Sequence, residues 1–169
     1  MPSIRSKPLV WAYLGLGSNL GCRRRHLQFA VRALARHGSV AARSRMIETE
    51  PVDCPDGGPF LNACVCLESD LSPRALLELA LRIERRRGRR RSARNAPRTL
   101  DIDILLYEGE RRSDADLVIP HPRMCERRFV LEPLAEIAPE VIHPARLVTV
   151  RELLQQLPDP RARHARAVH

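Results

Sequence analysis

Asp101 and Asp103 are the residues of this 169-residue sequence whose types and spacing point most directly to chemistry. They alternate with Leu100, Ile102 and Ile104. Because side chains alternate in direction along a strand, both carboxylates are expected on one face and the isoleucines in the core. Neighbouring carboxylates repel, so a cation is expected between them, and magnesium suits one or two carboxylates plus phosphate and water. An exposed strand that merely carries two acidic residues is the alternative.

A cluster of arginines before this strand offers phosphate-binding groups. Its members are Arg85, Arg86, Arg87, Arg89, Arg90, Arg91, Arg94 and Arg98. Guanidinium groups bind phosphate oxygens bidentately and neutralise charge during phosphoryl transfer. A solvated helix end and a nucleic-acid surface are the alternatives, and the second is weakened because no aromatic residue interleaves the arginines. Together with Asp101 and Asp103, the cluster favours a site for magnesium-bound nucleotide phosphates.

Phe60 and Asn62 are two residues apart in the alternating segment 60–68, so they are expected on the same strand face. An aromatic ring beside an amide suits a flat heterocycle with donor and acceptor edges. A core phenylalanine next to a strand-end asparagine is the alternative. His121 is held between two prolines, where it could contact a phosphate or cap the next segment; the residues alone assign it no catalytic role.

Composition limits the classes of protein and partner. The 29 basic and 20 acidic residues give a net charge of +9, which indicates anionic partners. We expect one domain over residues 1–169, with a core at about 9–157 and a disordered tail at 158–169. No apolar run is long enough to span a membrane. The five cysteines match no disulfide framework and indicate reduced thiols in a cytoplasmic protein, and zinc binding by Cys64 and Cys66 is not favoured.

The elements that must position these residues follow from apolar periodicity and turn residues. Strands are expected at 10–16, 41–48, 60–68 and 99–107, and helices at 23–36, 73–87 and 150–156, with 118–120 extended and 123–137 partly helical. Gly38 and Gly88 are expected to end the first two helices, and the polar pair Ser18-Asn19 to begin a turn or cap a helix. The order predicts an α+β, ferredoxin-like βαββαβ core with additional C-terminal elements, in which helices cover one face of a mainly antiparallel sheet and leave the other open.

Five blocks in order resemble the hydroxymethyl-dihydropterin pyrophosphokinase family of folate biosynthesis. They are residues 13–21, 48–52, 60–63, 95–105 and 120–134, and with their connections they cover about residues 13–144. The resemblance implies transfer of pyrophosphate from ATP to 6-hydroxymethyl-7,8-dihydropterin, with release of AMP. A basic, ferredoxin-like nucleic-acid-binding protein is the alternative function. A scaffold that has lost catalysis is a third, against which the intact Asp, Arg and Asn positions argue.

The resemblance also implies roles for individual residues. Two magnesium ions would be bound by Asp101 and Asp103, which with Arg89 and Arg91 would form the catalytic set. ATP would be bound by Glu84, Arg91, Arg98, Ile104, His121 and Arg127. The pterin would be bound by Thr49, Glu50, Val52, Phe60, Asn62 and Phe129. A monomer is expected. The chain departs from some members at Leu81, Asn95 and Pro122, which affects how ATP packs.

Overall fold

The computed structural model of the chain describes residues 7–51, 57–89 and 96–158. Several positions named above lie outside these residues: Val52, Arg90, Arg91, Arg94, Asn95 and the tail beyond Pro158. Within the described ranges, no helix combines the length and apolar character needed to cross a membrane.

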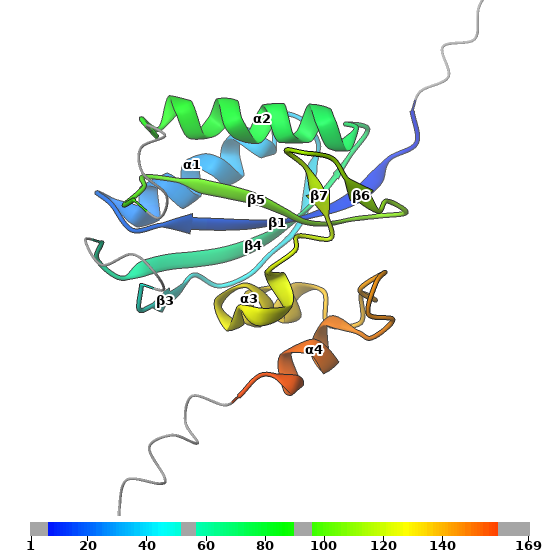
Figure 1. Cartoon of the computed structure of the whole chain (residues 1–169). Helices are drawn as coiled ribbons and strands as arrows, with labels where there is room; N and C mark the ends of the chain where they lie inside the picture. The colour runs from blue at the N-terminus through cyan, green and yellow to red at the C-terminus, as the bar shows by residue number, and fades with distance from the viewer. Residues whose placement is uncertain (1–6, 52–56, 90–95, 159–169) are drawn as a thin grey trace, which may run out of the picture.

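A five-stranded sheet forms the centre of the structure. Its strands are β1 (Val10–Ser18), β2 (Ser39–Arg43), β3 (Ile47–Thr49), β4 (Phe60–Ser69) and β5 (Asp101–Tyr107). The order is β2-β4-β1-β5, β3 also pairs with β4, and all pairs are antiparallel. The helices α1 (Arg23–Leu34) and α2 (Pro73–Arg86) cover one face, as Figure 1 shows. The predicted ferredoxin-like βαββαβ core is confirmed.

The additional elements follow β5. They are the hairpin β6 (Arg112–Ser113) and β7 (Val118–Ile119), the 3-10 helix η1 (Met124–Glu126), and the helices α3 (Arg128–Ile137) and α4 (Val150–Gln156). Arg74 of α2 anchors the hairpin by donating to Asp116 Oδ2 at 2.6 Å and Asp114 Oδ2 at 3.3 Å. These contacts hold the hairpin beside the outer strand β5.

Alternation along the strands separates two cores. Ala12, Leu14 and Leu16 of β1 and Val65 and Leu67 of β4 are buried beneath α1 and α2, as predicted. The side chains between them point to the opposite face of the sheet. That face therefore carries a different set of residues, among them the ones assigned to the site.

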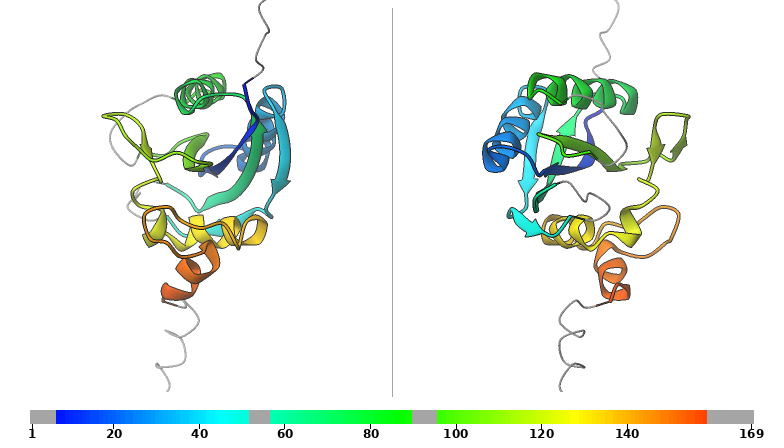
Figure 2. Two further views of the ribbon diagram at one scale, coloured as in Figure 1. Left: turned by 90° about the vertical axis from the view of Figure 1, so that its right-hand side faces the viewer. Right: turned by 60° about the vertical axis from the view of Figure 1, so that its left-hand side comes forward.

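The prediction that this second face is open is wrong in part. Tyr13, Cys66 and Leu106 of the sheet pack there against Val130 and Leu134 of α3. Figures 1 and 2 show α3 and α4 on the side of the sheet opposite α1 and α2. The cause is the apolar stripe of α3, which is buried by packing against β4. α3 therefore walls one side of the face on which the site lies.

Three local boundaries also differ from expectation. The single strand expected at 41–48 is two strands, β2 and β3, which pair with different parts of β4. The first helix ends at Leu34 instead of Arg36, and Gly38 does not end it. Gly38 is needed for another reason, since a Cβ there would collide with the Glu68 carbonyl oxygen. Gly88, with φ of +77°, follows the end of α2 as predicted.

Candidate active site

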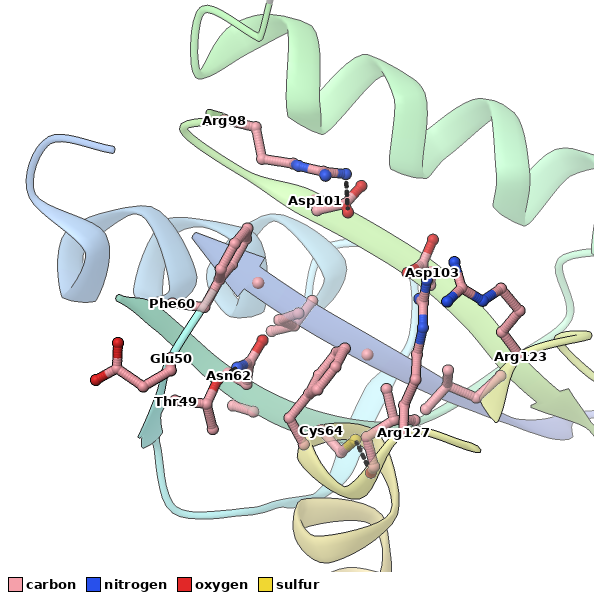
Figure 3. Close-up of a pocket in the computed structure, with 17 residues that line it drawn as sticks. Thr49, Glu50, Phe60, Asn62, Cys64, Arg98, Asp101, Asp103, Arg123 and Arg127 are labelled. Atoms are coloured by element: carbon pink, nitrogen blue, oxygen red, sulfur yellow. Dashed lines mark hydrogen bonds and ion pairs between the residues drawn. The ribbon is translucent and has the colours of Figure 1, made fainter. Parts of the chain in front are cut away.

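The two carboxylates of β5 face a cavity on the α3 side of the sheet (Figure 3). Ile102 and Ile104 point the other way and are 5% exposed, so the predicted alternation is confirmed. Strand pairing places Gly17 of β1 beside Asp101 and Gly15 beside Asp103. Since the same glycines pair with β4, they lie between the carboxylates and the residues of that strand.

The absence of side chains at Gly15 and Gly17 opens this cavity. Gly17 pairs with Asn62 on one side and with Asp101 on the other. A Cβ on Gly17 would lie 3.3 Å from Asn62 Oδ1 and 3.9 Å from Asp101 Cβ. Any larger residue would therefore fill the floor between the amide and the carboxylate. The glycines give the site a flat floor, which a planar ligand needs.

Two arginines neutralise Asp101. Arg89 Nη1 donates to Asp101 Oδ1 at 2.5 Å, and Arg98 Nη1 donates to Asp101 Oδ2 at 2.8 Å. Arg98 is itself positioned by Asn19, whose Oδ1 accepts from Arg98 N at 2.8 Å and whose backbone N–H donates to Arg98 O at 3.2 Å. Asn19 therefore fastens the end of β1 to the segment before β5. It does not cap α1, whose N-cap is Cys22.

Asp103 has little counter-charge among the described residues. Burial, followed by repulsion from Asp101, raises the pKa of Asp103 to about 7, although Arg127 and Arg89 oppose the rise. Asp103 makes no ion pair with the described part of the chain. A carboxylate pair short of positive charge, with hard oxygen donors on one face, fits Mg²⁺. The described residues hold no cluster of three or more His, Cys, Asp or Glu for a metal, so phosphate and water would supply the other ligands.

Two phenyl rings line the cavity, one on each side. Phe60 comes from β4 and Phe129 from α3, and Figure 3 shows the labelled Phe60 above Asn62. Arg98 lies over the Phe60 ring, with 5.8 Å from its Cζ to the ring centroid, and Arg127 lies over the Phe129 ring at 5.6 Å. Each ring is therefore linked through a guanidinium group to the carboxylate region.

The amide of Asn62 is oriented by Thr49. Asn62 Nδ2 donates to Thr49 Oγ1 at 2.7 Å, while Thr49 lies on β3 opposite Phe60. Asn62 is 6% exposed, and its Oδ1 faces the space above Gly17. A fixed amide between aromatic walls offers a donor and acceptor edge to a flat heterocycle.

Arg123 and Arg127 add positive charge to the cavity wall. Burial and the neighbouring Arg123 guanidinium lower the pKa of Arg127. Two close guanidinium groups at a partly buried wall favour an anion between them. Together with Arg98 and the carboxylates, they form a region suited to a metal-bound polyphosphate.

Comparison with known proteins identifies the family. The family model described as 7,8-dihydro-6-hydroxymethylpterin-pyrophosphokinase matches residues 13–139. The chain belongs to this family. It is similar to the 2-amino-4-hydroxy-6-hydroxymethyldihydropteridine pyrophosphokinases of Methylorubrum extorquens, 48% identical over 88% of this chain and 94% of that one, and of Bacillus subtilis, 47% identical over 77% and 79%.

Solved structures share the fold of this pyrophosphokinase family. The chain superposes on wild-type Plasmodium falciparum HPPK-DHPS with a TM-score of 0.73 at 15% identity. The match covers 90% of this chain and 45% of the Plasmodium chain, so the chain spans less than half of that longer protein. At this identity the likeness concerns the fold alone.

Most of the residues that the family resemblance selected meet in one cavity. They are Thr49, Glu50, Phe60, Asn62, Arg98, Asp101, Asp103, Arg127 and Phe129. Arg89 joins them through Asp101, whereas Val52 and Arg91 lie outside the described residues.

Three of the selected residues do not line this cavity. Glu84 is 3% exposed, accepts from Ile102 N at 2.8 Å and forms an ion pair with Arg89. The Ile104 side chain lies in the helix-side core. His121 lies beside the hairpin, and its Nδ1 accepts from Arg123 N at 3.2 Å. Burial and Arg127 lower the pKa of His121, so its neutral ring has Nε2–H as a donor.

Sequence reasoning missed four contributors to the site: Gly15, Gly17, Asn19 and Arg123. The glycines left a usable signal, since Gly in alternate positions of a strand often marks the close approach of a ligand. Asn19 and Arg123 left none, because their roles depend on residues that strand pairing and the α3 segment bring near.

Proposed function

We propose that the chain transfers pyrophosphate from ATP to 6-hydroxymethyl-7,8-dihydropterin, giving the dihydropterin pyrophosphate and AMP in folate biosynthesis. The observation that carries this proposal is the glycine floor that joins Asn62 to Asp101 in a single cavity. It sets a site for a flat heterocycle next to a site for metal-bound phosphates. The names of the pyrophosphokinase relatives favour the same activity over nucleic-acid binding.

In this proposal the heterocycle lies between Phe60 and Phe129, and Asn62 reads its polar edge. Thr49 and Glu50 line the same end of the cavity, and Val52 follows them in the sequence. Stacking between two rings orients the pterin in its plane. The hydroxymethyl group then points along the glycine floor toward the carboxylates.

The ATP phosphates lie at the carboxylate end. Arg98, Arg127, His121 and Arg89 contact their oxygens, and Arg91, two residues after Arg89 in the sequence, is assigned to the same phosphates by the family resemblance. Asp101 and Asp103 would hold the two Mg²⁺ ions that the family resemblance implies, and these would neutralise charge on the phosphate oxygens. Ile104 contributes through its backbone, since its side chain is in the core. Glu84 acts by positioning Arg89 and β5, because it is buried between them.

The reaction forms a bond between the hydroxymethyl oxygen and the β-phosphorus of ATP. The bond from that phosphorus to the oxygen bridging to the α-phosphate breaks, AMP leaves, and the hydroxyl proton passes to solvent. Arg98 and Arg127 hold the reacting groups in line and stabilise the charge of the transferring group. No general base is required, since phosphoryl transfer depends mainly on positioning and electrostatic stabilisation.

The test is incubation of the protein with ATP, MgCl₂ and 6-hydroxymethyl-7,8-dihydropterin, followed by chromatography of the nucleotides. AMP and the pterin pyrophosphate should form in equal amounts and only with all three reagents. Formation of ADP instead, or of AMP without pterin, would contradict the proposal. Titration with EDTA should abolish AMP formation, and added MgCl₂ should restore it.

The proposal extends to the state of the protein in the cell. We expect a cytoplasmic monomer in which residues 9–157 fold as one domain. The described cysteines Cys22, Cys64, Cys66 and Cys125 are free, which suits a reducing compartment. Light scattering at several concentrations would reveal a dimer if the monomer assignment is wrong.

A further inference from the structure

A second groove lies beside the hairpin and shares no lining residue with the carboxylate cavity. It is lined by β6 and β7, by Pro120–Pro122, and by residues 143–146, which join α3 to α4. Figure 2 shows the hairpin and this connecting segment on the same side of the molecule. None of the proposed magnesium or pterin ligands belongs to this groove, whereas His121, to which the proposed function assigns a contact with the ATP phosphates, lines it.

Three arginines give the groove its charge: Arg111, Arg112 and Arg146. Arg112 forms ion pairs with Glu110 and Asp114, and its Nε is buried without a hydrogen-bond partner. Arg111 and Arg146 form no ion pair with a carboxylate in the described part of the chain. The groove therefore has positive charge that no ion pair within the described residues compensates.

His143 supplies a fixed donor to the same groove. It is 5% exposed, and its Nδ1 accepts from Ala145 N at 3.3 Å and from Arg146 N at 3.2 Å. With Nδ1 occupied as an acceptor, the neutral ring carries its proton on Nε2. Burial and the guanidinium groups of Arg146 and Arg111 lower the pKa of His143, which favours the neutral ring, and both arginines line the same groove.

We propose that this groove binds the phosphate or pyrophosphate group of a small anionic metabolite, with Arg111, Arg146 and the His143 Nε2–H as its ligands. Guanidinium groups and a neutral imidazole N–H together match the oxygens of such a group. A nucleic-acid surface is less favoured, because no Phe, Tyr or Trp lines the groove for base stacking. The inference goes beyond the proposed transfer reaction, because its three ligands are not among the residues assigned to ATP, magnesium or the pterin.

Binding of an anion in the groove can be followed through the NMR signal of the His143 ring. Protein labelled with ¹³C at histidine is titrated with inorganic pyrophosphate, without Mg²⁺ and at constant ionic strength, and the His143 ring signal is assigned by its loss in His143→Gln. We expect a saturable shift of this signal. The same shift should persist in Arg98→Ala, which weakens anion binding at the carboxylate cavity and leaves the groove intact.

Charge variants test which residues bind the anion. Arg111→Ala/Arg146→Ala should raise the pyrophosphate concentration that gives half of the maximal His143 shift at least about tenfold. The matched control is Arg24→Ala/Arg25→Ala, which removes the same charge from exposed positions on α1 and should leave the shift unchanged. Circular dichroism establishes that each variant is folded, and Arg146→Ala alone serves if the double variant is not.

Four outcomes would overturn the inference. The His143 signal shows no saturable response, which means that the groove does not bind the anion. The response disappears in Arg98→Ala, which assigns binding to the carboxylate cavity. It weakens equally in both double variants, which indicates non-specific attraction. It occurs with a single-stranded oligonucleotide and not with pyrophosphate, which indicates a nucleic-acid surface. AMP formation is measured separately, so none of these results bears on the proposed reaction.

Discussion

The two sides of the cavity contain the same kinds of group but differ in charge compensation. The Asp101 side consists of Phe60, Arg98 and Asp101, and the Asp103 side of Phe129, Arg127 and Asp103. On the Asp101 side two arginines contact the carboxylate and Asn19 fixes one of them. On the Asp103 side the carboxylate has no ion pair within the described residues and its pKa is raised to about 7.

The Asp101 side is therefore preorganised by its arginines, whereas the Asp103 carboxylate has no cationic side chain paired with it among the described residues. The Asp101 side is complete in the chain alone, because its ring, guanidinium and carboxylate are already held together. The Asp103 side has a carboxylate with no ion pair among the described residues, which a bound cation would stabilise. We therefore expect substitutions on the Asp103 side to affect metal-dependent chemistry most, and substitutions around Asp101 to affect geometry.

The largest effect is expected for Asp103→Ala. AMP formation should fall on the order of a hundredfold to a thousandfold, since a group that stabilises charge in the transition state is removed. The fold should survive, because the substitution relieves a buried charge. Steady-state kinetics at saturating ATP and MgCl₂ measure the effect, with Asp116→Ala in the hairpin as the control. Turnover of Asp103→Ala close to that of the unmodified chain would refute the assignment of Asp103.

Asn19→Ala should have the next largest effect, on the Asp101 side. Loss of the acceptor for Arg98 N should cost about 1–3 kcal/mol of unfolding free energy and lower kcat about tenfold, because Arg98 is no longer held against Asp101. Asn19→Asp retains an acceptor oxygen and should recover most of kcat. If both variants lose only stability, Asn19 has no positioning role in the reaction.

The charge difference should also appear in the pH dependence of stability without metal. Because the folded-state pKa of Asp103 is about 7 and its ordinary value is 3.8, the folded protein holds this proton more tightly than the unfolded chain. Asp103 therefore lowers stability progressively as pH rises between these values.

Asp103→Asn removes this titration. In EDTA, urea unfolding should show the variant more stable than the unmodified chain by on the order of 1–3 kcal/mol at pH 8, with a smaller difference at pH 5. Asp116→Asn is the control. Because Arg74 lowers the pKa of Asp116, this substitution should lower the stability of the protein instead of raising it. A difference that is the same at both pH values would show that Asp103 is not the source.

The smallest effects are expected at the rings. Phe60→Leu and Phe129→Leu should each raise KM for the dihydropterin roughly threefold to tenfold, which corresponds to a loss of about 0.5–1.5 kcal/mol of stacking energy. Calorimetric titration with the pterin would measure the same loss as a change in Kd. A large effect at one ring and none at the other would show that the heterocycle is not held between them.

Local patterns were sufficient for much of the fold. Alternation predicted that Asp101 and Asp103 share a face, and the helix expected from residue 73 begins there, with Ser72 as its N-cap accepting from Ala75 N. The split of 41–48 into β2 and β3 was missed, because the break depends on where each half pairs with β4. The cover provided by α3 was missed because an apolar stripe does not say which surface it will bury.

The sequence by itself determined the chemical groups of the site: a carboxylate pair, arginines, two phenyl rings and an amide, at spacings that identify the family. The tertiary structure decided how these groups combine. Register among β4, β1 and β5 places Gly17 between Asn62 and Asp101, residues that are far apart in the chain. It also paired Asp101 with two arginines, whereas Asp103 forms no ion pair within the described residues. Side-chain direction follows from the backbone repeat, whereas register and charge compensation arise from non-local pairing.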